Sequence, residues 1–233
     1  MPPAATSPPP HGYFITGTDT GVGKTLVACA LLHAFRAAGR RVAGMKPVAA
    51  GADLAAEGLL NADVQLLRAA SSIDAPLALV NPYCFAPPIA PHIAAEEAGV
   101  TIDVARIREA FLQLAAAADT VIVEGVGGFC VPLNRNEDTA GLAQRLALPV
   151  ILVVGMRLGC LNHALLTASA IHGRGLRLGG WIANRIDPAM ASAGANIRAL
   201  TERLAAPLIA DIGFAAAPDP ARIAALIDLS RLT

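Results

Sequence analysis

The residues with the clearest chemical meaning form a glycine-rich loop near the start of the chain, Gly17-Thr-Asp-Thr-Gly-Val-Gly-Lys-Thr25. An expected strand precedes this loop and an expected helix follows it, which is the context of a phosphate-binding loop. Glycines let backbone N–H groups turn towards phosphate oxygens, Lys24 can reach the β- and γ-phosphates, and Thr25 can bind Mg²⁺. Five residues rather than four separate the first glycine from Gly23, so the loop is a longer variant of the common pattern. It predicts a nucleoside triphosphate with Mg²⁺ and nothing narrower.

Lysine is scarce in this chain, because only Lys24 and Lys46 are lysines among the 18 basic residues. Such scarcity suggests that a compact ammonium group is kept where a planar guanidinium would not serve. Lys46 ends a second expected strand, where it could neutralise charge on a carbamate or a transferring phosphoryl group. The alternative is a lysine whose stem lies along the surface.

Two acidic residues are candidate metal ligands. Glu124 directly follows an apolar segment, which places its carboxylate at the carboxyl end of a central strand, where open α/β sheets bind ligands. A carboxylate buried there needs a partner such as Mg²⁺, although a solvated acid at a strand end is the alternative. Asp63 lies near the start of a short expected helix and is explained equally well as a helix-start acid or a metal ligand.

Apolar segments alternate with helical patterns along the chain. The expected strands are 13–16, 41–46, 120–123, 149–154, 178–183 and 208–212. The expected helices are 24–38, 61–70 (with Asn61 as N-cap), 102–117, 139–146, 161–172, 191–204 and 221–229. This alternation predicts an α/β fold of the P-loop NTPase type, in which helices cover both faces of a parallel β-sheet.

Two segments depart from this alternation. Residues 72–100 contain five prolines and are expected to form a long irregular excursion that serves as a lid, a dimer contact or both. Residues 1–11 are expected to form a disordered proline-rich tail, and 12–233 a single domain.

Composition and charge exclude several classes of protein. The 233-residue chain carries 18 basic and 18 acidic residues, and this balance argues against non-specific nucleic-acid binding. Its longest apolar run ends at Arg157, short of the roughly 20 residues that a bilayer requires. The first residues do not follow the signal-peptide pattern, and the four cysteines show no C-x-x-C spacing. We therefore expect a cytoplasmic protein with reduced thiols and no membrane partner.

Together with further motifs, the loop closely resembles the dethiobiotin synthetase family, over about residues 13–214. The motifs that carry the resemblance are the loop itself, Gly44-Met-Lys-Pro-Val48, Asn81-Pro-Tyr83, Pro91-His92, Val123-Glu-Gly-Val-Gly-Gly128, Pro149-Val-Ile-Leu-Val-Val-Gly155, Leu158-Gly-Cys-Leu-Asn-His163 and Gly180-Trp-Ile-Ala-Asn184. The resemblance implies that ATP and Mg²⁺ are used to join CO₂ to 7,8-diaminopelargonate (7,8-diaminononanoate), giving dethiobiotin, ADP and phosphate. One amine becomes a carbamate, which attacks the γ-phosphate, and the second amine then closes the ureido ring of this biotin precursor.

The resemblance also implies a role for each site residue. Thr25, Asp63 and Glu124 would be the Mg²⁺ ligands. Lys24, Lys46 and Thr20 would lie at the reacting groups. The nucleotide site would consist of Gly21, Val22, Gly23, Lys24, Thr25, Leu26, Asp63, Glu124, Gly125, Val126, Gly127, Asn184, Gly213, Phe214 and Ala215. The family is homodimeric, so Leu161 and Asn162 at a helix start would bind the carboxylate of a substrate held by the partner subunit, with Lys46 also contacting substrate.

Three residues or segments depart from the family pattern. Ala50 stands where serine or threonine is common, Arg185 stands where an acid is often found, and Ile212-Gly-Phe214 lacks the usual proline. Two other functions on this scaffold are a partitioning switch and a glutamine-dependent amidoligase. The first is disfavoured because Asp19 replaces a lysine near the start of the loop, and the second because no glutaminase-like Cys/His arrangement is apparent.

Overall fold

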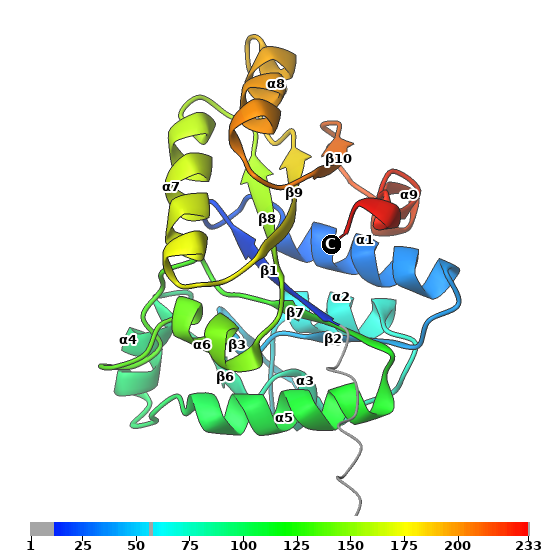
Figure 1. Cartoon of the computed structure of the whole chain (residues 1–233). Helices are drawn as coiled ribbons and strands as arrows, with labels where there is room; N and C mark the ends of the chain where they lie inside the picture. The colour runs from blue at the N-terminus through cyan, green and yellow to red at the C-terminus, as the bar shows by residue number, and fades with distance from the viewer. Residues whose placement is uncertain (1–11, 56–57, 233) are drawn as a thin grey trace, which may run out of the picture.

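The computed structural model describes residues 12–55 and 58–232, and its centre is a six-stranded β-sheet (Figure 1). The strand order is β10-β9-β8-β1-β7-β2, and every neighbouring pair is parallel. The strands are β1 (Gly12–Gly17), β2 (Val42–Met45), β7 (Thr120–Glu124), β8 (Val150–Gly155), β9 (Leu178–Asn184) and β10 (Leu208–Ile212). The predicted α/β fold is confirmed, whereas the predicted tail over 1–11 lies outside the described residues.

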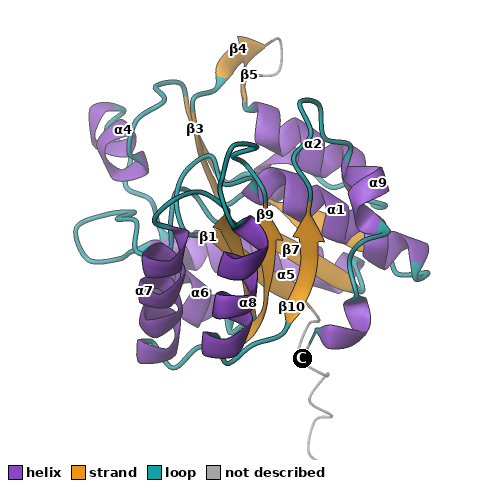
Figure 2. Cartoon of the chain, turned by 90° about the horizontal axis from the view of Figure 1, so that it is seen from above, coloured by secondary structure: helices purple, strands orange, loops and turns teal. Residues whose placement is uncertain are grey.

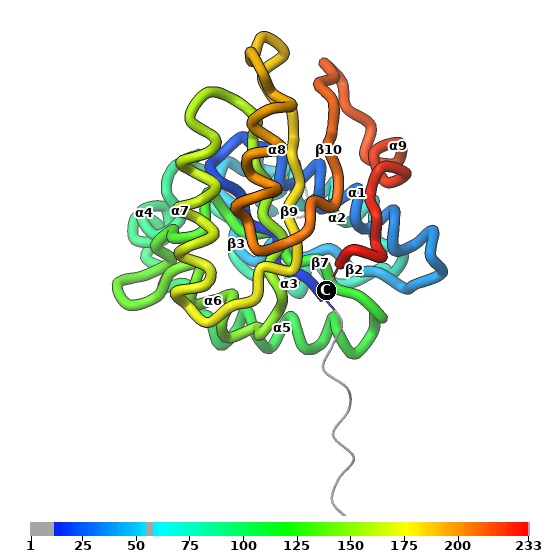
Figure 3. Tube along the Cα trace, turned by 45° about the horizontal axis from the view of Figure 1, so that its top comes forward, coloured from blue at the N-terminus to red at the C-terminus, as the bar shows by residue number. Residues whose placement is uncertain are grey.

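Helices cover both faces of this sheet, so alternate residues of a central strand pack in different cores. In β1, Phe14 packs in the core on one face and Ile15 in the core on the other. The first face is covered by α5 (Val104–Ala117), α6 (Thr139–Leu146), α7 (Cys160–Gly173) and α8 (Ala193–Arg203). The second is covered by α1 (Lys24–Ala37), α2 (Ala62–Ala70) and α9 (Pro220–Ala224), with α9 lying beside α1 (Figure 3).

Segment 72–100 is more ordered than the sequence predicts, so the prediction of an irregular excursion is wrong. It contains α3 (Leu77–Val80), β6 (Tyr83–Phe85) and α4 (Pro91–Glu97). Pro91 occupies the first turn of α4, where proline is tolerated because its missing N–H has no partner to lose. Strand β6 pairs with β3 (Val48–Ala50), which follows Lys46 closely. The excursion therefore braces the segment that carries Lys46.

Two other elements differ from expectation. An antiparallel hairpin, β4 (Asp53–Ala55) and β5 (Gly58–Leu60), precedes α2 (Figure 2). The last expected helix, 221–229, ends at Ala224 as α9 and is followed by a 3₁₀ turn, Leu229–Arg231. No helix within the described ranges is both long and apolar enough to cross a bilayer.

Candidate active site at the carboxyl ends of the strands

The glycine-rich loop joins the end of β1 to the start of α1, as predicted. The N–H of Thr18 donates to the carbonyl of Val153 in β8 over 3.0 Å, which ties the loop to the neighbouring strand. Gly23 has a φ of +90°, and a Cβ there would collide with Nδ2 of Asn184. That amide donates to the carbonyl of Val22 over 2.9 Å. Glycine is thus required at position 23 by both backbone conformation and contact.

Lys24 is the first residue of α1 and its side chain is buried beneath the loop. Its Nζ donates to the backbone carbonyl of Asp19 over 3.0 Å. Burial, and then the nearby charge of Lys46, lower the pKa of Lys24 to about 8. A bound polyphosphate would favour the charged form again, because an opposite charge stabilises an ammonium group.

Lys46, Glu124 and Asp63 converge from three different elements. Lys46 follows β2, Glu124 ends the adjacent strand β7, and Asp63 lies in the first turn of α2. The Lys46 ammonium forms an ion pair with Oε1 of Glu124 and lies 3.1 Å from Oδ2 of Asp63. Burial alone would lower the pKa of Lys46, but the charges of Glu124 and Asp63 raise it above its ordinary value. The ammonium is therefore charged although it is buried.

The second oxygen of Glu124 makes this cluster suitable for a cation. The Thr25 hydroxyl donates to Oε1 of Glu124 over 2.9 Å, whereas the buried Oε2 has no hydrogen-bond partner among the described residues. Leaving a buried carboxylate oxygen unpaired is costly. The hydroxyl and the carboxylates of Glu124 and Asp63 fit Mg²⁺, which commonly binds one or two protein carboxylates together with substrate phosphates. This set contains only two carboxylates, and the described ranges hold no group of three or more His, Cys, Asp or Glu residues placed to bind a metal ion.

These residues line one cavity of about 320 Å³. The predicted site residues that it brings together are Thr20, Gly21, Gly23, Lys24, Thr25, Lys46, Asp63, Glu124, Val126 and Gly127, and Ala50 also lines it. Val22 lies within the glycine-rich loop, Leu26 in the first turn of α1 and Gly125 directly after β7, and Asn184 is the last residue of β9.

Other predicted residues lie apart from that cavity. Gly213 and Phe214 line a different cavity of about 410 Å³ with Arg185, and Ala215 follows them in the chain. Arg185 makes a two-pronged ion pair with Asp211, at 2.8 and 2.7 Å. Leu161 and Asn162 lie in the first turn of α7.

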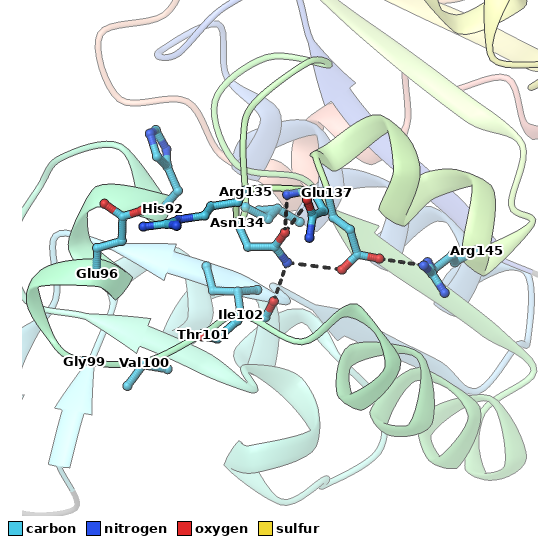
Figure 4. A pocket seen from close by; sticks show the side chains of 12 residues that line it. His92, Glu96, Gly99, Val100, Thr101, Ile102, Asn134, Arg135, Glu137 and Arg145 are labelled. Atoms are coloured by element: carbon cyan, nitrogen blue, oxygen red, sulfur yellow. Dashed lines mark hydrogen bonds and ion pairs between the residues drawn. The ribbon is translucent and has the colours of Figure 1, made fainter.

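A larger cavity of about 940 Å³ lies between α4 and the loop 132–137 (Figure 4). Its walls include His92 and Arg135, and Asn134 bridges the carbonyl of Ile102 and the carboxylate of Glu137. It shares no lining residue with the cavity at the glycine-rich loop. Size alone therefore does not identify the site of chemistry.

Sequence reasoning missed one pair beside the loop. Arg157 Nη2 lies 2.5 Å from Oδ2 of Asp19. The signal was available, because Arg157 follows the end of β8 just as Glu124 ends β7. A charged residue at a strand end in a parallel sheet lies at the ligand-binding edge.

Comparison with known proteins identifies the family of this chain. An AAA domain family model matches residues 11–220. The ATP-dependent dethiobiotin synthetase BioD of Aromatoleum aromaticum is 61% identical over 220 residues, which are 94% of this chain and 98% of the relative. The protein of that name from Nitrosospira multiformis is 55% identical, over 95% of this chain and 96% of the relative. The chain belongs to the dethiobiotin synthetase family.

Solved structures extend the comparison beyond the dethiobiotin synthetase family. The MinD cell division protein of Aquifex aeolicus has a TM-score of 0.54 and 17% identity, over 88% of this chain and 83% of that one. The signal recognition particle 54 kDa protein of Aeropyrum pernix has a TM-score of 0.52 and 17% identity, over 97% of this chain and 48% of that one. At this identity the likeness shows the fold alone, which is that of P-loop NTPases. The enzymes of the dethiobiotin synthetase family are ATP-dependent ligases.

Proposed function

We propose that this chain joins CO₂ to 7,8-diaminopelargonate with ATP and Mg²⁺, giving dethiobiotin, ADP and phosphate. The observation that carries the proposal is the convergence of both lysines of the chain on Glu124 and the glycine-rich loop. The names of the curated relatives support the same reaction. The product is a precursor of biotin, and we propose that the reaction takes place in the cytoplasm.

The reaction needs positioning and charge stabilisation more than covalent chemistry by the protein. One amine of the substrate takes up CO₂ as a carbamate, and a carbamate oxygen attacks the γ-phosphate to form a mixed anhydride with release of ADP. The second amine attacks the carbonyl carbon, which closes the ureido ring and expels phosphate. In this scheme Lys46 and Lys24 stabilise negative charge on the carbamate and the γ-phosphate, with Thr20 beside them.

Thr25, Asp63 and Glu124 would hold Mg²⁺. When bound, the cation would offset negative charge on the phosphates. Lys46 balances the carboxylates of Glu124 and Asp63, and its side chain also lines the cavity at the glycine-rich loop. Because Lys46 lines the cavity in which the carbamate and the γ-phosphate would lie, we assign it to the substrate and not to the structure of the site alone.

The remaining predicted residues would bind the rest of the nucleotide and the tail of the substrate. Gly21 to Leu26 would hold the triphosphate, and Glu124 to Gly127 would also line the nucleotide site. Asn184 would bind the adenine edge through its carbonyl oxygen, since its amide group donates to the loop, and 213–215 would close over the base. We propose a homodimer in which the start of α7, with Leu161 and Asn162, binds the carboxylate of substrate held by the other subunit.

A direct assay tests this function. The purified protein is incubated with ATP, Mg²⁺, bicarbonate and the diamine, and both ADP and dethiobiotin are measured. We expect equal amounts of the two products, and an absence of ADP release that depends on the diamine rejects the proposal. Omission of bicarbonate is a matched control, because it removes the carbamate and leaves ATP and the diamine in place.

A further inference from the structure

Asp19 and Arg157 link the glycine-rich loop to the turn between β8 and α7. The two oxygens of the Asp19 carboxylate have different partners: Oδ2 lies 2.5 Å from Nη2 of Arg157, and Oδ1 accepts from the N–H of Thr20 over 2.7 Å. The backbone carbonyl of the same aspartate accepts from Lys24. Asp19 therefore orders the loop through its side chain and its main chain.

The charge of Asp19 is unusual in its surroundings. The loop otherwise offers N–H groups and an ammonium group, all of which favour an anion. The N–H of Thr20, together with Arg157 and the nearby His163, lowers the pKa of Asp19, so this carboxylate is negative at neutral pH. An uncompensated negative charge at this position would oppose the binding of a triphosphate.

The turn that carries Arg157 is held firmly by the sheet. Met156 donates its N–H to the carbonyl of Asn184 over 2.7 Å, and Thr18 in the loop donates to Val153 in β8. The guanidinium is thus presented to the loop from a fixed backbone. Because the side chains of Arg157 and Asp19 are 42% and 47% exposed, the pair contributes little to folding stability.

We propose that Arg157 is a positioning residue for nucleotide binding, which neutralises Asp19 and holds its carboxylate away from the phosphates. The proposal rests on the use of ATP at this loop. It differs from a purely structural role in one respect: the loss of ATP affinity on removing Arg157 comes from the negative charge left on Asp19. Removal of the Asp19 charge should then restore most of the ATP affinity.

The test is a double-mutant cycle on the affinity for MgATP, measured by titration calorimetry on the full chain. We expect Arg157→Ala to raise Kd about tenfold. The conservative Arg157→Lys should stay within about threefold of wild type, because it keeps the charge. Asp19→Asn in the Arg157→Ala background should restore Kd to within about threefold of the Asp19→Asn single variant.

Arg174→Ala is a matched control. Arg174 pairs with Asp138 over 2.6 Å and is also 42% exposed, but its partner lies outside the glycine-rich loop, at the start of α6. This variant should leave Kd unchanged, and thermal melts should show that all variants fold.

Either of two results overturns the proposal: a Kd for Arg157→Ala within about twofold of wild type, or no recovery on adding Asp19→Asn. A wild-type chain that binds no ATP overturns the proposal and the proposed function together. If the double-mutant cycle gives the expected Kd values but the protein does not convert the diamine, only the proposed reaction is rejected.

Discussion

The ammonium group of Lys46 and the carboxylate of Glu124 form a direct ion pair between neighbouring strand ends, although the residues are 78 positions apart in the chain. Lys46 is 4% exposed and Glu124 1%, so both charges are largely removed from bulk water. Removing one charge of a buried pair typically costs about 3–5 kcal/mol, because the other charge is left uncompensated. Informative variants of this pair must therefore preserve shape or charge.

Lys46→Arg should lose most of the activity and keep the fold. The planar guanidinium keeps the positive charge but cannot place a compact ammonium between Glu124, Asp63 and a carbamate. ADP release in the presence of the diamine measures the loss, and a thermal melt checks folding. Turnover within about twofold of wild type, or ~0.4 kcal/mol in the barrier, shows that the lysine has no special role.

Glu124→Gln should raise the Mg²⁺ concentration required for half-maximal turnover by about tenfold, because a neutral amide is a weaker Mg²⁺ ligand. The variant also weakens the contacts to Lys46 and Thr25, so thermal melts accompany the kinetic titration. Glu137→Gln is the matched control, since Glu137 pairs with Arg145 and is not part of the cavity at the glycine-rich loop. An unchanged Mg²⁺ requirement in Glu124→Gln removes Glu124 from the ligand set.

Gly23→Ala and Gly39→Ala separate contact from backbone strain. Both glycines have positive φ, at +90° and +81°, so each alanine carries a left-handed backbone cost of roughly 1–2 kcal/mol. Only at Gly23 does the added Cβ collide with Asn184, which would be displaced from the Val22 carbonyl. We expect both variants to lose stability in urea denaturation and only Gly23→Ala to lose ATP affinity. Equal affinities in the two variants would contradict this account of the loop.

Cys29 should make stability fall with pH in the alkaline range. Burial raises the pKa of this thiol from 9.0 to about 12. Between pH 9 and 12 the unfolded chain therefore loses the thiol proton while the folded chain keeps it, which stabilises the unfolded state. Between pH 8 and 10.5 the wild type should lose about 2 kcal/mol more unfolding free energy than Cys29→Ala. Urea denaturation at the two pH values measures the difference, with Cys130→Ala as a control on an exposed thiol. If the unfolding free energies of wild type and Cys29→Ala fall equally with pH, the raised pKa of Cys29 is refuted.

Regular elements could be predicted where their evidence is local. The apolar segment that became β8 is buried at every position, as expected for a central parallel strand. The sequence predicts Asn61 as an N-cap, and its side chain does accept from the N–H of Asp63. Both features depend on neighbouring residues in the chain, which the sequence displays directly.

Segment 72–100 shows where local evidence misleads. The prolines of this segment predict irregular structure, yet Pro91 begins α4. Strand β6 could not be predicted because it is three residues long and pairs with β3, which lies more than thirty residues earlier in the chain. A strand of this kind exists only through its partner.

The sequence by itself determined the family, the glycine-rich loop, the two lysines and the strand-end acid, because these are properties of residue type and local order. Only the tertiary structure decided that Lys46 pairs with Glu124 and Asp63, and that Arg157 pairs with Asp19. Such pairs depend on the order of the strands in the sheet, which brings distant segments to one edge.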